Sequence, residues 1–203
     1  MPTPTERPFD PLDYDNIANS VVRVLLERPL LPLAGLEPFR GAGIYALYYT
    51  GALAEYGPIA TPVGEIPIYV GKAVPTGARK GTGVRGVSPG RTLCNRLRQH
   101  SASIEQAENL KGADFLCRYL VVEPVWIRLA ERVLIQESRP VWNTILEGFG
   151  NHPPGRGRRS MRRPRWDIVH PGRAWAMELE AAEEPATIWT EVRAHLERSG
   201  GGG

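Results

Sequence analysis

The feature that most constrains this chain is a pair of short strand-like segments that each carry tyrosine close to glycine. The first segment, residues 43–50, begins with Gly43-Ile44-Tyr45. The second, residues 66–70, ends with Tyr69-Val70 and is followed by Gly71. The first segment alternates as a β-strand does, with Tyr45, Leu47 and Tyr49 on one face and Ile44, Ala46 and Tyr48 on the other. A helical stretch with Arg96 and His100 follows. The chain is therefore expected to place phenols, a guanidinium and an imidazole in one small domain.

The rest of the chain predicts helices around a sheet. A third strand is expected at 115–122, and helices are expected at 15–27, 93–103, 126–138 and 188–197. Asp13 or Asp15 can cap the first helix, and Pro140 stops the third. We predict an α+β fold with a central three-stranded antiparallel sheet flanked by helices. This core (41–150) follows an N-terminal helix and extended arm (1–40) and precedes a basic C-terminal extension with a terminal helix (151–203).

Charge is distributed unevenly along the chain. Residues 66–104 contain seven basic residues and no acidic one, residues 148–166 contain six arginines and no acidic one, and the rest has a net charge of −10. Arginine fills 22 of the 25 basic positions, and its fork suits phosphate and guanine because it makes two parallel hydrogen bonds. A GC-rich genome explains the arginine preference but not the missing acids. The pattern predicts nucleic-acid contact through Arg79, Lys80, Arg85, Arg91, Arg156, Arg158 and Arg159.

Composition argues against several classes of protein. Cys94 and Cys117 are the only cysteines and lack metal-site spacing, so we expect both to be small core residues rather than zinc ligands or a disulfide. No apolar run approaches the roughly 18 residues that a membrane helix needs. Residues 1–11 are proline-rich and lack a signal-peptide pattern. We expect a cytoplasmic protein with no membrane partner.

The motifs, taken in order, resemble a known family. Gly-Ile-Tyr, Tyr-Val-Gly, an arginine on the next helix, a glutamate on a later helix and an asparagine after a proline are similar to the GIY-YIG nuclease superfamily. The likeness is closer to its type II restriction endonuclease branch that recognises CCGCGG. It extends over the strings at 41–51, 69–75, 148–152 and 166–173, and so covers most of the chain. Val70 stands where isoleucine is usual, which is a conservative departure.

The resemblance implies that Tyr45 and Tyr69 lie beside the scissile phosphate, with Tyr45 as a candidate general base. An unperturbed tyrosine has a pKa of about 10, so a nearby cation is needed to favour the phenolate. Lys72 and a metal-bound water are the two alternatives for that role. Without the resemblance, each tyrosine is more simply a strand residue that packs on its neighbours.

Arg96 and His100 are four residues apart, so a helix projects both from one face toward one phosphate. The resemblance makes Arg96 the family's essential arginine, which holds the phosphate as its charge develops. His100 is expected to position the attacking water or to relay a proton. Arg98 lies about 200° around the helix from Arg96 and is expected to face away. Taken alone, this spacing of arginine and histidine usually marks a surface pair.

Two carboxylates compete for the metal. Glu131 lies twelve residues before Asn143, as the family's metal-binding glutamate does, whereas Glu137 lies near the helix end beside Arg139. We therefore choose Glu131 as the metal ligand. The expected metal is Mg²⁺, for which Mn²⁺ can substitute, because Mg²⁺ keeps most of its waters and needs few protein ligands. Asn143 is expected to support the backbone or the tyrosine region. An asparagine that simply takes a turn conformation after Pro140 is an equally good alternative.

The resemblance implies Mg²⁺-dependent hydrolysis of double-stranded DNA at a short palindrome, with CCGCGG expected and 5′-phosphate ends produced. A domain with one site that cuts both strands of a palindrome works most simply as a symmetric homodimer. Two alternatives stay open. One is a homing or repair GIY-YIG nuclease, which normally carries a separate DNA-binding domain. The other is a non-catalytic DNA-binding module with a vestigial site.

Overall fold

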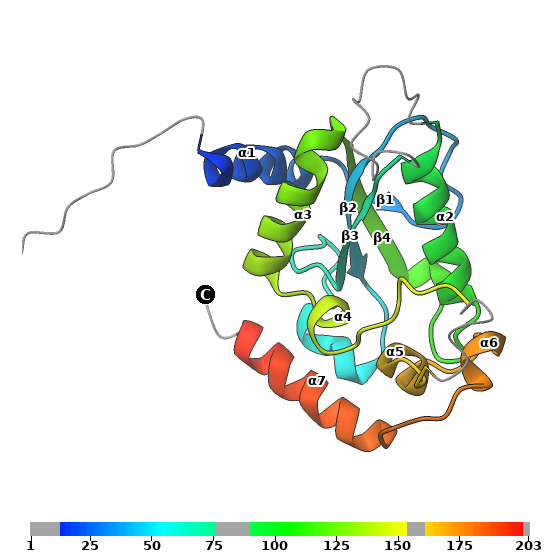
Figure 1. The fold of residues 1–203 in the computed structure, drawn as a ribbon. Helices are drawn as coiled ribbons and strands as arrows, with labels where there is room; N and C mark the ends of the chain where they lie inside the picture. Colours follow the sequence, from blue (N-terminus) through cyan, green and yellow to red (C-terminus); the bar gives the residue numbers. More distant parts are fainter. Residues whose placement is uncertain (1–12, 76–89, 154–160, 201–203) are drawn as a thin grey trace, which may run out of the picture.

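The core of the protein is an antiparallel sheet with helices on both faces (Figure 1). Its computed structural model describes residues 13–75, 90–153 and 161–200. The strands lie in the order β1-β4-β2-β3 and are β1 (Leu31–Pro32), β2 (Gly43–Tyr49), β3 (Tyr69–Ala73) and β4 (Phe115–Val121). The α-helices are α1 (Tyr14–Leu26), α2 (Thr92–Glu105), α3 (Pro124–Ser138), α4 (Val141–Thr144), α5 (Arg165–Val169), α6 (Ala174–Met177) and α7 (Pro185–Gly200). Two 3-10 turns, η1 (Ala54–Ile59) and η3 (Gly112–Asp114), join them.

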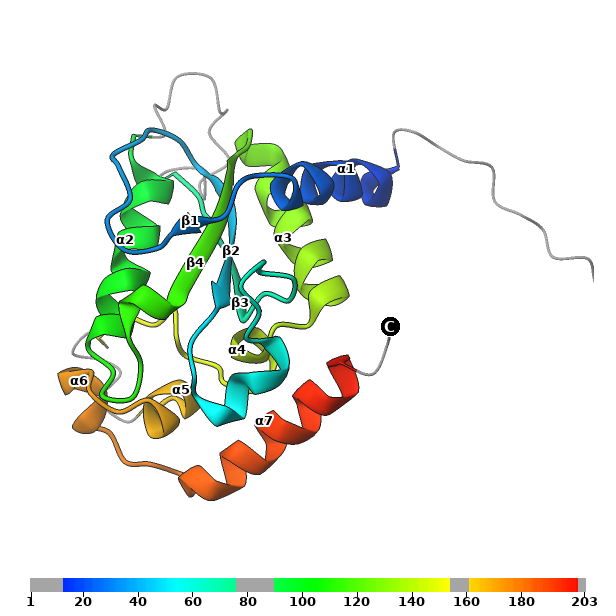
Figure 2. The same ribbon diagram turned by 180° about the vertical axis from the view of Figure 1, so that it is seen from behind.

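The central strand β2 is buried along its whole length, and its two faces belong to different clusters. Tyr45, Leu47 and Tyr49 pack with residues of α2, α4, α5 and α7, which form the α2-side core. Ile44, Ala46 and Tyr48 pack with residues of α1 and α3. Figures 1 and 2 show α1 and α3 on one side of the sheet and α2 on the other. The predicted alternation of this strand is therefore confirmed, and so is the α+β class.

Helix ends follow the chemistry of their terminal residues. The carboxylate of Asp13 accepts a hydrogen bond of 2.9 Å from the Asp15 amide and caps α1. Pro124 occupies the first turn of α3, where no amide hydrogen is needed. Arg139 ends α3 with a left-handed backbone (φ 43°), and Pro140 follows it. The predicted stop at this proline is confirmed.

Two strand predictions differ from the structure. The segment expected at 66–70 lies at Tyr69–Ala73, because Pro67 has no amide hydrogen for a ladder and the pairing instead aligns Tyr45 with Gly71. The sheet also has four strands rather than three. The extra strand β1 comes from the arm, where Leu31 pairs with Cys117. A two-residue strand carries too little alternation to be recognised in a sequence.

The C-terminal region, expected as an extension, packs into the α2-side core. Residues Trp166, Ile168, Ile188, Val192 and Leu196 of α5 and α7 all belong to that cluster. Cys94 and Cys117 are buried and unpaired, as predicted. The C-terminal helices therefore share the α2-side core with one face of β2.

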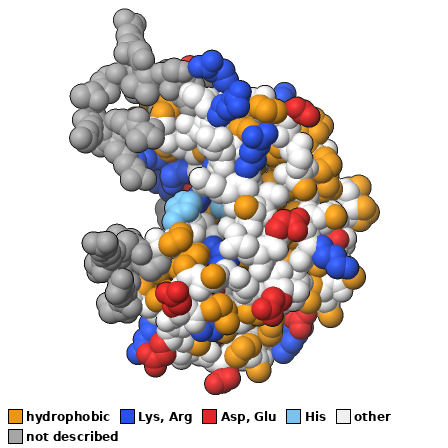
Figure 3. Space-filling model, turned by 90° about the vertical axis from the view of Figure 1, so that its right-hand side faces the viewer, with side chains coloured by type: hydrophobic (Ala, Val, Ile, Leu, Met, Phe, Trp, Pro, Cys, Tyr) orange, Lys and Arg blue, Asp and Glu red, His pale blue; other side chains and the backbone are white. Residues whose placement is uncertain are grey.

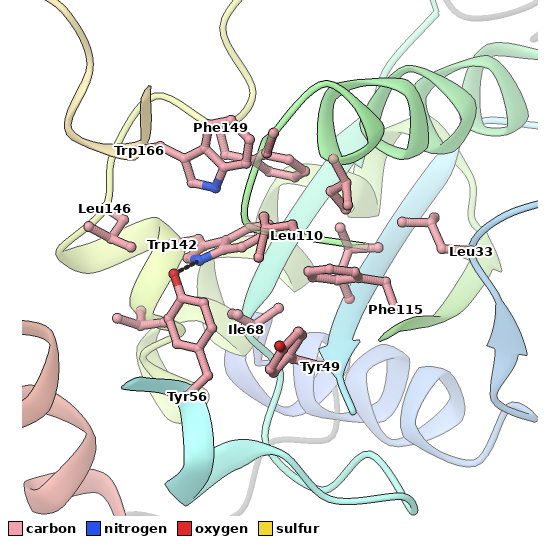
Figure 4. Packing of buried hydrophobic residues seen from close by; sticks show 14 of the residues in the cluster. Leu33, Tyr49, Tyr56, Ile68, Leu110, Phe115, Trp142, Leu146, Phe149 and Trp166 are labelled. Carbon is pink, nitrogen blue, oxygen red and sulfur yellow. Dashed lines mark hydrogen bonds between the residues drawn. The ribbon is translucent and has the colours of Figure 1, made fainter. Parts of the chain in front are cut away.

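A buried chain of hydrogen bonds fastens this region to η1, to α4 and to the loop after α2. The Trp142 indole only donates, and it donates to the Tyr56 hydroxyl at 2.8 Å (Figure 4). Tyr56 then donates to Nε2 of His170 at 2.6 Å, so Nδ1 carries the proton and donates to the Asn109 side-chain oxygen at 2.9 Å. Asn109 donates in turn to the carbonyl of Val169 at 2.9 Å. Each group in this chain has a hydrogen-bond partner, so none of them adds the free-energy cost of a buried polar group without one.

Candidate active site

The two motif tyrosines lie on neighbouring strands because of their register. Tyr45 on β2 pairs with Gly71 on β3, and Tyr69 lies two residues before Gly71 on the same face. The rings of Tyr45 and Tyr69 are 6.2 Å apart between centroids. A Cβ atom at position 71 would lie 2.3 Å from the Tyr45 hydroxyl oxygen. Glycine is therefore required there so that the Tyr45 phenol can lie across β3.

Helix α2 brings an imidazole to the first phenol. The Tyr45 hydroxyl and Nε2 of His100 form a hydrogen bond of 2.5 Å. His100 is only 1% exposed. Its burial lowers its pKa well below the ordinary value, and the nearby charges of Arg96, His152 and Arg173 lower that pKa further. His100 is consequently neutral near pH 7 and has one nitrogen able to accept a proton.

Aromatic rings enclose the imidazole. Phe149 stacks on His100 with centroids 4.5 Å apart and planes 20° from parallel. The Tyr69 ring lies edge-on to His100 at 5.2 Å and to Phe149 at 5.0 Å. These contacts hold the ring of His100 in one orientation and keep bulk water away from it.

Both phenols are more difficult to ionise than a free tyrosine. Burial raises the pKa of Tyr45 well above its usual value, and the phenol of Tyr69 adds to this effect. Burial also raises the pKa of Tyr69. The guanidinium of Arg96 opposes burial at both positions, whereas the carboxylate of Glu131 raises both values. Arg96 and Glu131 therefore both lie within electrostatic reach of the two hydroxyl groups.

Arg96 connects α2 to the loop after α4. Its Nη2 donates to the carbonyl of Gly150 at 2.9 Å, and its Nη1 contacts Nε2 of His152 at 3.0 Å. Arg98 instead donates to the carbonyl of Leu36 in the arm at 2.8 Å. The predicted division between Arg96 at the site and Arg98 facing away is the one that the structure shows.

Glu131 reaches the site from the opposite face of the sheet. It lies on α3 and forms an ion pair with Lys72, which projects from β3 toward that helix; the two side chains are 15% and 37% exposed. Lys72 was one of two alternatives for the cation that favours a phenolate, and the structure pairs it with this carboxylate. Glu137 is exposed and lines a different cavity, next to Glu65. Of the two competing carboxylates, only Glu131 lies near the tyrosines.

The residues present fit a magnesium ion better than a metal that needs a full protein shell. Among the described residues, no group of three or more His, Cys, Asp or Glu side chains gathers in one place. Glu131, which is paired with Lys72, offers a single carboxylate within electrostatic reach of Tyr45 and Tyr69. Mg²⁺ retains several waters and is often bound by one or two carboxylates plus substrate phosphate oxygens. Zn²⁺, which prefers four protein nitrogen or sulfur ligands at structural sites, has no such set here.

Asn143 completes the free edge of β3. Its side-chain oxygen accepts from the Val70 amide at 2.8 Å, and its side-chain nitrogen donates to the Val70 carbonyl at 2.9 Å. The neighbouring Trp142 amide donates to the carbonyl of Ile68 at 3.0 Å. The amide side chain therefore acts as one more ladder pair on the edge strand, and it holds β3 between its two motif residues Tyr69 and Gly71.

Two cavities meet at the arginine. One has a volume of about 220 Å³ and extends past His100, and the other has a volume of about 490 Å³ and extends past Lys72. Arg96 and His152 line both. Figure 3 shows a histidine (pale blue) and basic side chains (blue) in a hollow at the left edge of the view. The joined cavities form a groove that leads past a guanidinium to the buried imidazole.

Comparison with known proteins agrees with this geometry. A family model described as the Eco29kI GIY-YIG domain matches residues 37–196, which is most of the chain. The chain belongs to the Eco29kI GIY-YIG family. This is a family of restriction endonucleases, so the chain is a DNA nuclease and its macromolecular partner is DNA. No curated protein matches it.

The Eco29kI GIY-YIG match covers parts of the site that the sequence motifs left without a role. Phe149 and His152 come from the loop at 148–152, and Arg173 comes from the string at 166–173. Both strings contributed to the family likeness in the sequence. Only the folded structure shows that Phe149 contacts His100, that His152 contacts Arg96 and that Arg173 binds the loop at 148–152, because these contacts join segments that are far apart in the sequence.

Most of the arginines expected to bind DNA lie outside the described residues. These are Arg79, Lys80, Arg85, Arg156, Arg158 and Arg159. Arg91 is described and is exposed at the start of α2, the helix that carries Arg96. Within the described part of the chain, none of the helices combines the length and the apolar character needed to cross a bilayer.

Proposed function

We propose that this protein is a type II restriction endonuclease that uses Mg²⁺ to hydrolyse double-stranded DNA at a short palindrome. The observation that carries the proposal is the hydrogen bond between Tyr45 and a neutral, buried His100, within electrostatic reach of Arg96 and Glu131. Tyr56 and His170 form a similar pair that only supports the fold, and the Tyr45–His100 pair differs from it because Arg96 and Glu131 act on the same phenol. The same four groups supply a proton path, a phosphate ligand and a metal ligand.

The proton path runs from water to His100. As the attacking water loses a proton to the Tyr45 oxygen, the Tyr45 hydroxyl hydrogen passes along the 2.5 Å hydrogen bond to Nε2 of His100. This concerted transfer avoids a free phenolate, which the raised pKa of Tyr45 disfavours. The negative charge that develops on the phosphate raises the affinity of His100 for the proton.

The remaining residues act on the phosphate. The new bond forms between the water oxygen and phosphorus, and the bond from phosphorus to the 3′ oxygen breaks, which leaves 5′-phosphate and 3′-hydroxyl ends once the 3′ oxygen takes a proton from solvent. Arg96 stabilises the charge on the phosphate oxygens. Glu131 would hold Mg²⁺, which supplies positive charge at the phosphate and lowers the pKa of its bound waters; Mn²⁺ fits the same donor.

The family supports a restriction enzyme over a homing or repair nuclease. CCGCGG remains our expectation for the recognition site because of the sequence resemblance, and abundant arginine suits bidentate contacts to guanine. Cleavage of both strands of a palindrome by a domain with one site is the reason for proposing a homodimer. A restriction enzyme acts on DNA inside the cell, so we propose that the protein is cytoplasmic.

A plasmid digest tests this function. Supercoiled plasmid DNA with one CCGCGG site is incubated with the protein in Mg²⁺ or in EDTA, and the ends are sequenced. We expect linear DNA with 5′-phosphate ends in Mg²⁺ alone. Binding without cleavage in any divalent cation would establish the non-catalytic alternative, and ends at unrelated sequences would overturn the expected site.

Two matched variants test the metal ligand. Glu131→Gln keeps the size of the side chain but removes its charge, and we expect the cleavage rate to fall by about 10²–10³-fold or more. Glu137→Gln is the control, because this residue lies on the same helix and lines another cavity. Equal activity of the two variants would show that Glu131 does not bind the metal.

A further inference from the structure

The loop formed by residues 148–152, here called the wall loop, supplies several contacts to the site. Phe149 stacks on His100, the carbonyl of Gly150 accepts from Arg96, and His152 contacts the same guanidinium. The wall loop contains no regular strand or helix to hold its main chain. Its position therefore depends on the packing of Phe149 against Trp142 and Trp166 and on the groups that bind its backbone carbonyls.

Arg173 binds three of those carbonyls. Its Nη1 donates to Phe149 at 2.9 Å and to Asn151 at 3.4 Å, and its Nη2 donates to Gly148 at 3.1 Å. Arg173 lies before α6 and is 2% exposed. One side chain thus fixes the backbone on both sides of the ring that stacks on His100.

Arg173 is itself held rigidly. Its Nε and Nη2 donate to the two oxygens of Asp167, each at 2.5 Å, and Asp167 is 1% exposed. The rings of Trp166 and Trp175 lie 4.6 Å and 4.9 Å from the guanidinium carbon. All five donors of the guanidinium fork have acceptors, so the orientation of Arg173 is fully determined.

Stability alone does not account for such a pair. Removing two charges from water is costly, and apolar replacements of buried ion pairs are often neutral or stabilising. Apolar residues cannot donate hydrogen bonds to the carbonyls of Gly148, Phe149 and Asn151. The ion pair can therefore hold the backbone of the wall loop in place, which a hydrophobic contact of equal volume cannot do.

We propose that Arg173, oriented by Asp167, is a positioning residue of the active site that holds the wall loop so that Phe149 fixes His100 and the Gly150 carbonyl fixes Arg96. This inference rests on the proposed nuclease function. The hydrogen bonds of Arg173 go to neither phenol and not to the carboxylate of Glu131. It acts through the loop, from a segment outside the tyrosine motifs.

Three variants and one control test this role in the full-length protein. Arg173→Met removes the fork and the charge, Arg173→Lys keeps only the charge, and Asp167→Asn keeps the shape of the partner. The control is Arg165→Met, because Arg165 lies in the same region and is paired with Glu183 and Glu191 but does not contact the wall loop. Thermal unfolding and DNA binding in EDTA report folding, and single-turnover cleavage in Mg²⁺ reports the chemistry.

We expect Arg173→Met to bind DNA as the parent does and to cleave it about 10²-fold more slowly, which is the usual cost of misplacing reacting groups by about 1 Å. Arg173→Lys should also be slow, since lysine cannot bind the three carbonyls together. The pH profile adds a readout that a loss of stability alone does not move. Tyr45 and Tyr69 contact His100, and the charges of Arg96, His152 and Arg173 lower its pKa. Loss of the Arg173 charge should move the acid limb of the cleavage rate to higher pH, and Arg165→Met should not move it.

The results distinguish failure of the proposed nuclease function from failure of the proposed role of Arg173. If the parent does not cleave DNA, the proposed function is wrong. If the parent cleaves and folded Arg173→Met cleaves within threefold of it with an unchanged pH profile, the positioning role is wrong while the nuclease stands. If all three variants fail to fold and Arg165→Met folds, the pair serves stability alone and the proposal is overturned.

Discussion

The buried imidazole of His170 should make the protein measurably less stable in mild acid. His170 is completely buried between the Tyr56 hydroxyl and the Asn109 amide. Burial lowers its pKa from 6.5 to about 3. The unfolded chain therefore takes up a proton at His170 near pH 6.5, whereas the folded protein does so only near pH 3.

The magnitude follows from this difference. A group whose folded pKa is lower than its unfolded pKa binds its proton first in the unfolded state, so acid favours unfolding. The contribution of His170 to stability is complete above pH 6.5 and is lost as the pH falls from 6.5 toward 3. At about 1.36 kcal/mol per pH unit, the loss between pH 8 and pH 5 is about 2 kcal/mol.

Urea unfolding of the parent and of His170→Gln at pH 8 and pH 5 measures this term. Glutamine still accepts a hydrogen bond from Tyr56 and does not titrate in this range. We expect the stability difference between the two pH values to be about 2 kcal/mol smaller in the variant. His100 shifts stability in the same direction in both proteins, and so cancels. An equal pH dependence in parent and variant would refute the reasoning.

Three further predictions address the sheet edge and the groove. Gly71→Ala places a Cβ 2.3 Å from the Tyr45 oxygen, so single-turnover cleavage should fall by about 10²-fold; parental activity would show that the close packing is not needed. Asn143→Ala leaves the Val70 amide and carbonyl without their side-chain partner, so urea unfolding should show a loss of about 2 kcal/mol; an unchanged midpoint would mean that water replaces the amide at no cost. Arg91→Ala should weaken DNA binding in EDTA and reduce the slope of log K against log salt by about 1, and an unchanged slope would place Arg91 off the interface.

Local sequence patterns predicted most of the elements. Residues 43–50 predicted β2 because successive side chains of a strand point to opposite faces, and both faces of this strand are buried. Pro140 marked the end of α3, and Asp13 the start of α1. Strand β3 was displaced because its limits depend on pairing with β2, which a single segment does not encode. The two-residue strand β1 exists only through its contact with β4.

Within the site, the residue types and their helical spacing were readable in advance. Arg96 and His100 had to share a face of α2 because four residues make about one helical turn. The partner of Lys72 was not readable, since Glu131 lies 59 residues away on a helix of the other layer. The same holds for Arg173 and the wall loop, which meet only when α5 packs against the core.

The sequence thus determined which chemical groups the protein contains. It also determined how each short segment folds, because backbone periodicity and capping act over one or two turns. Only packing of the two helical layers against the sheet decided which groups meet. Tyr45 became a hydrogen-bond partner of His100, Lys72 became a partner of Glu131, and one buried guanidinium came to hold the wall loop. Such contacts join distant segments, and their geometry is set by register and by the volume of the core between them.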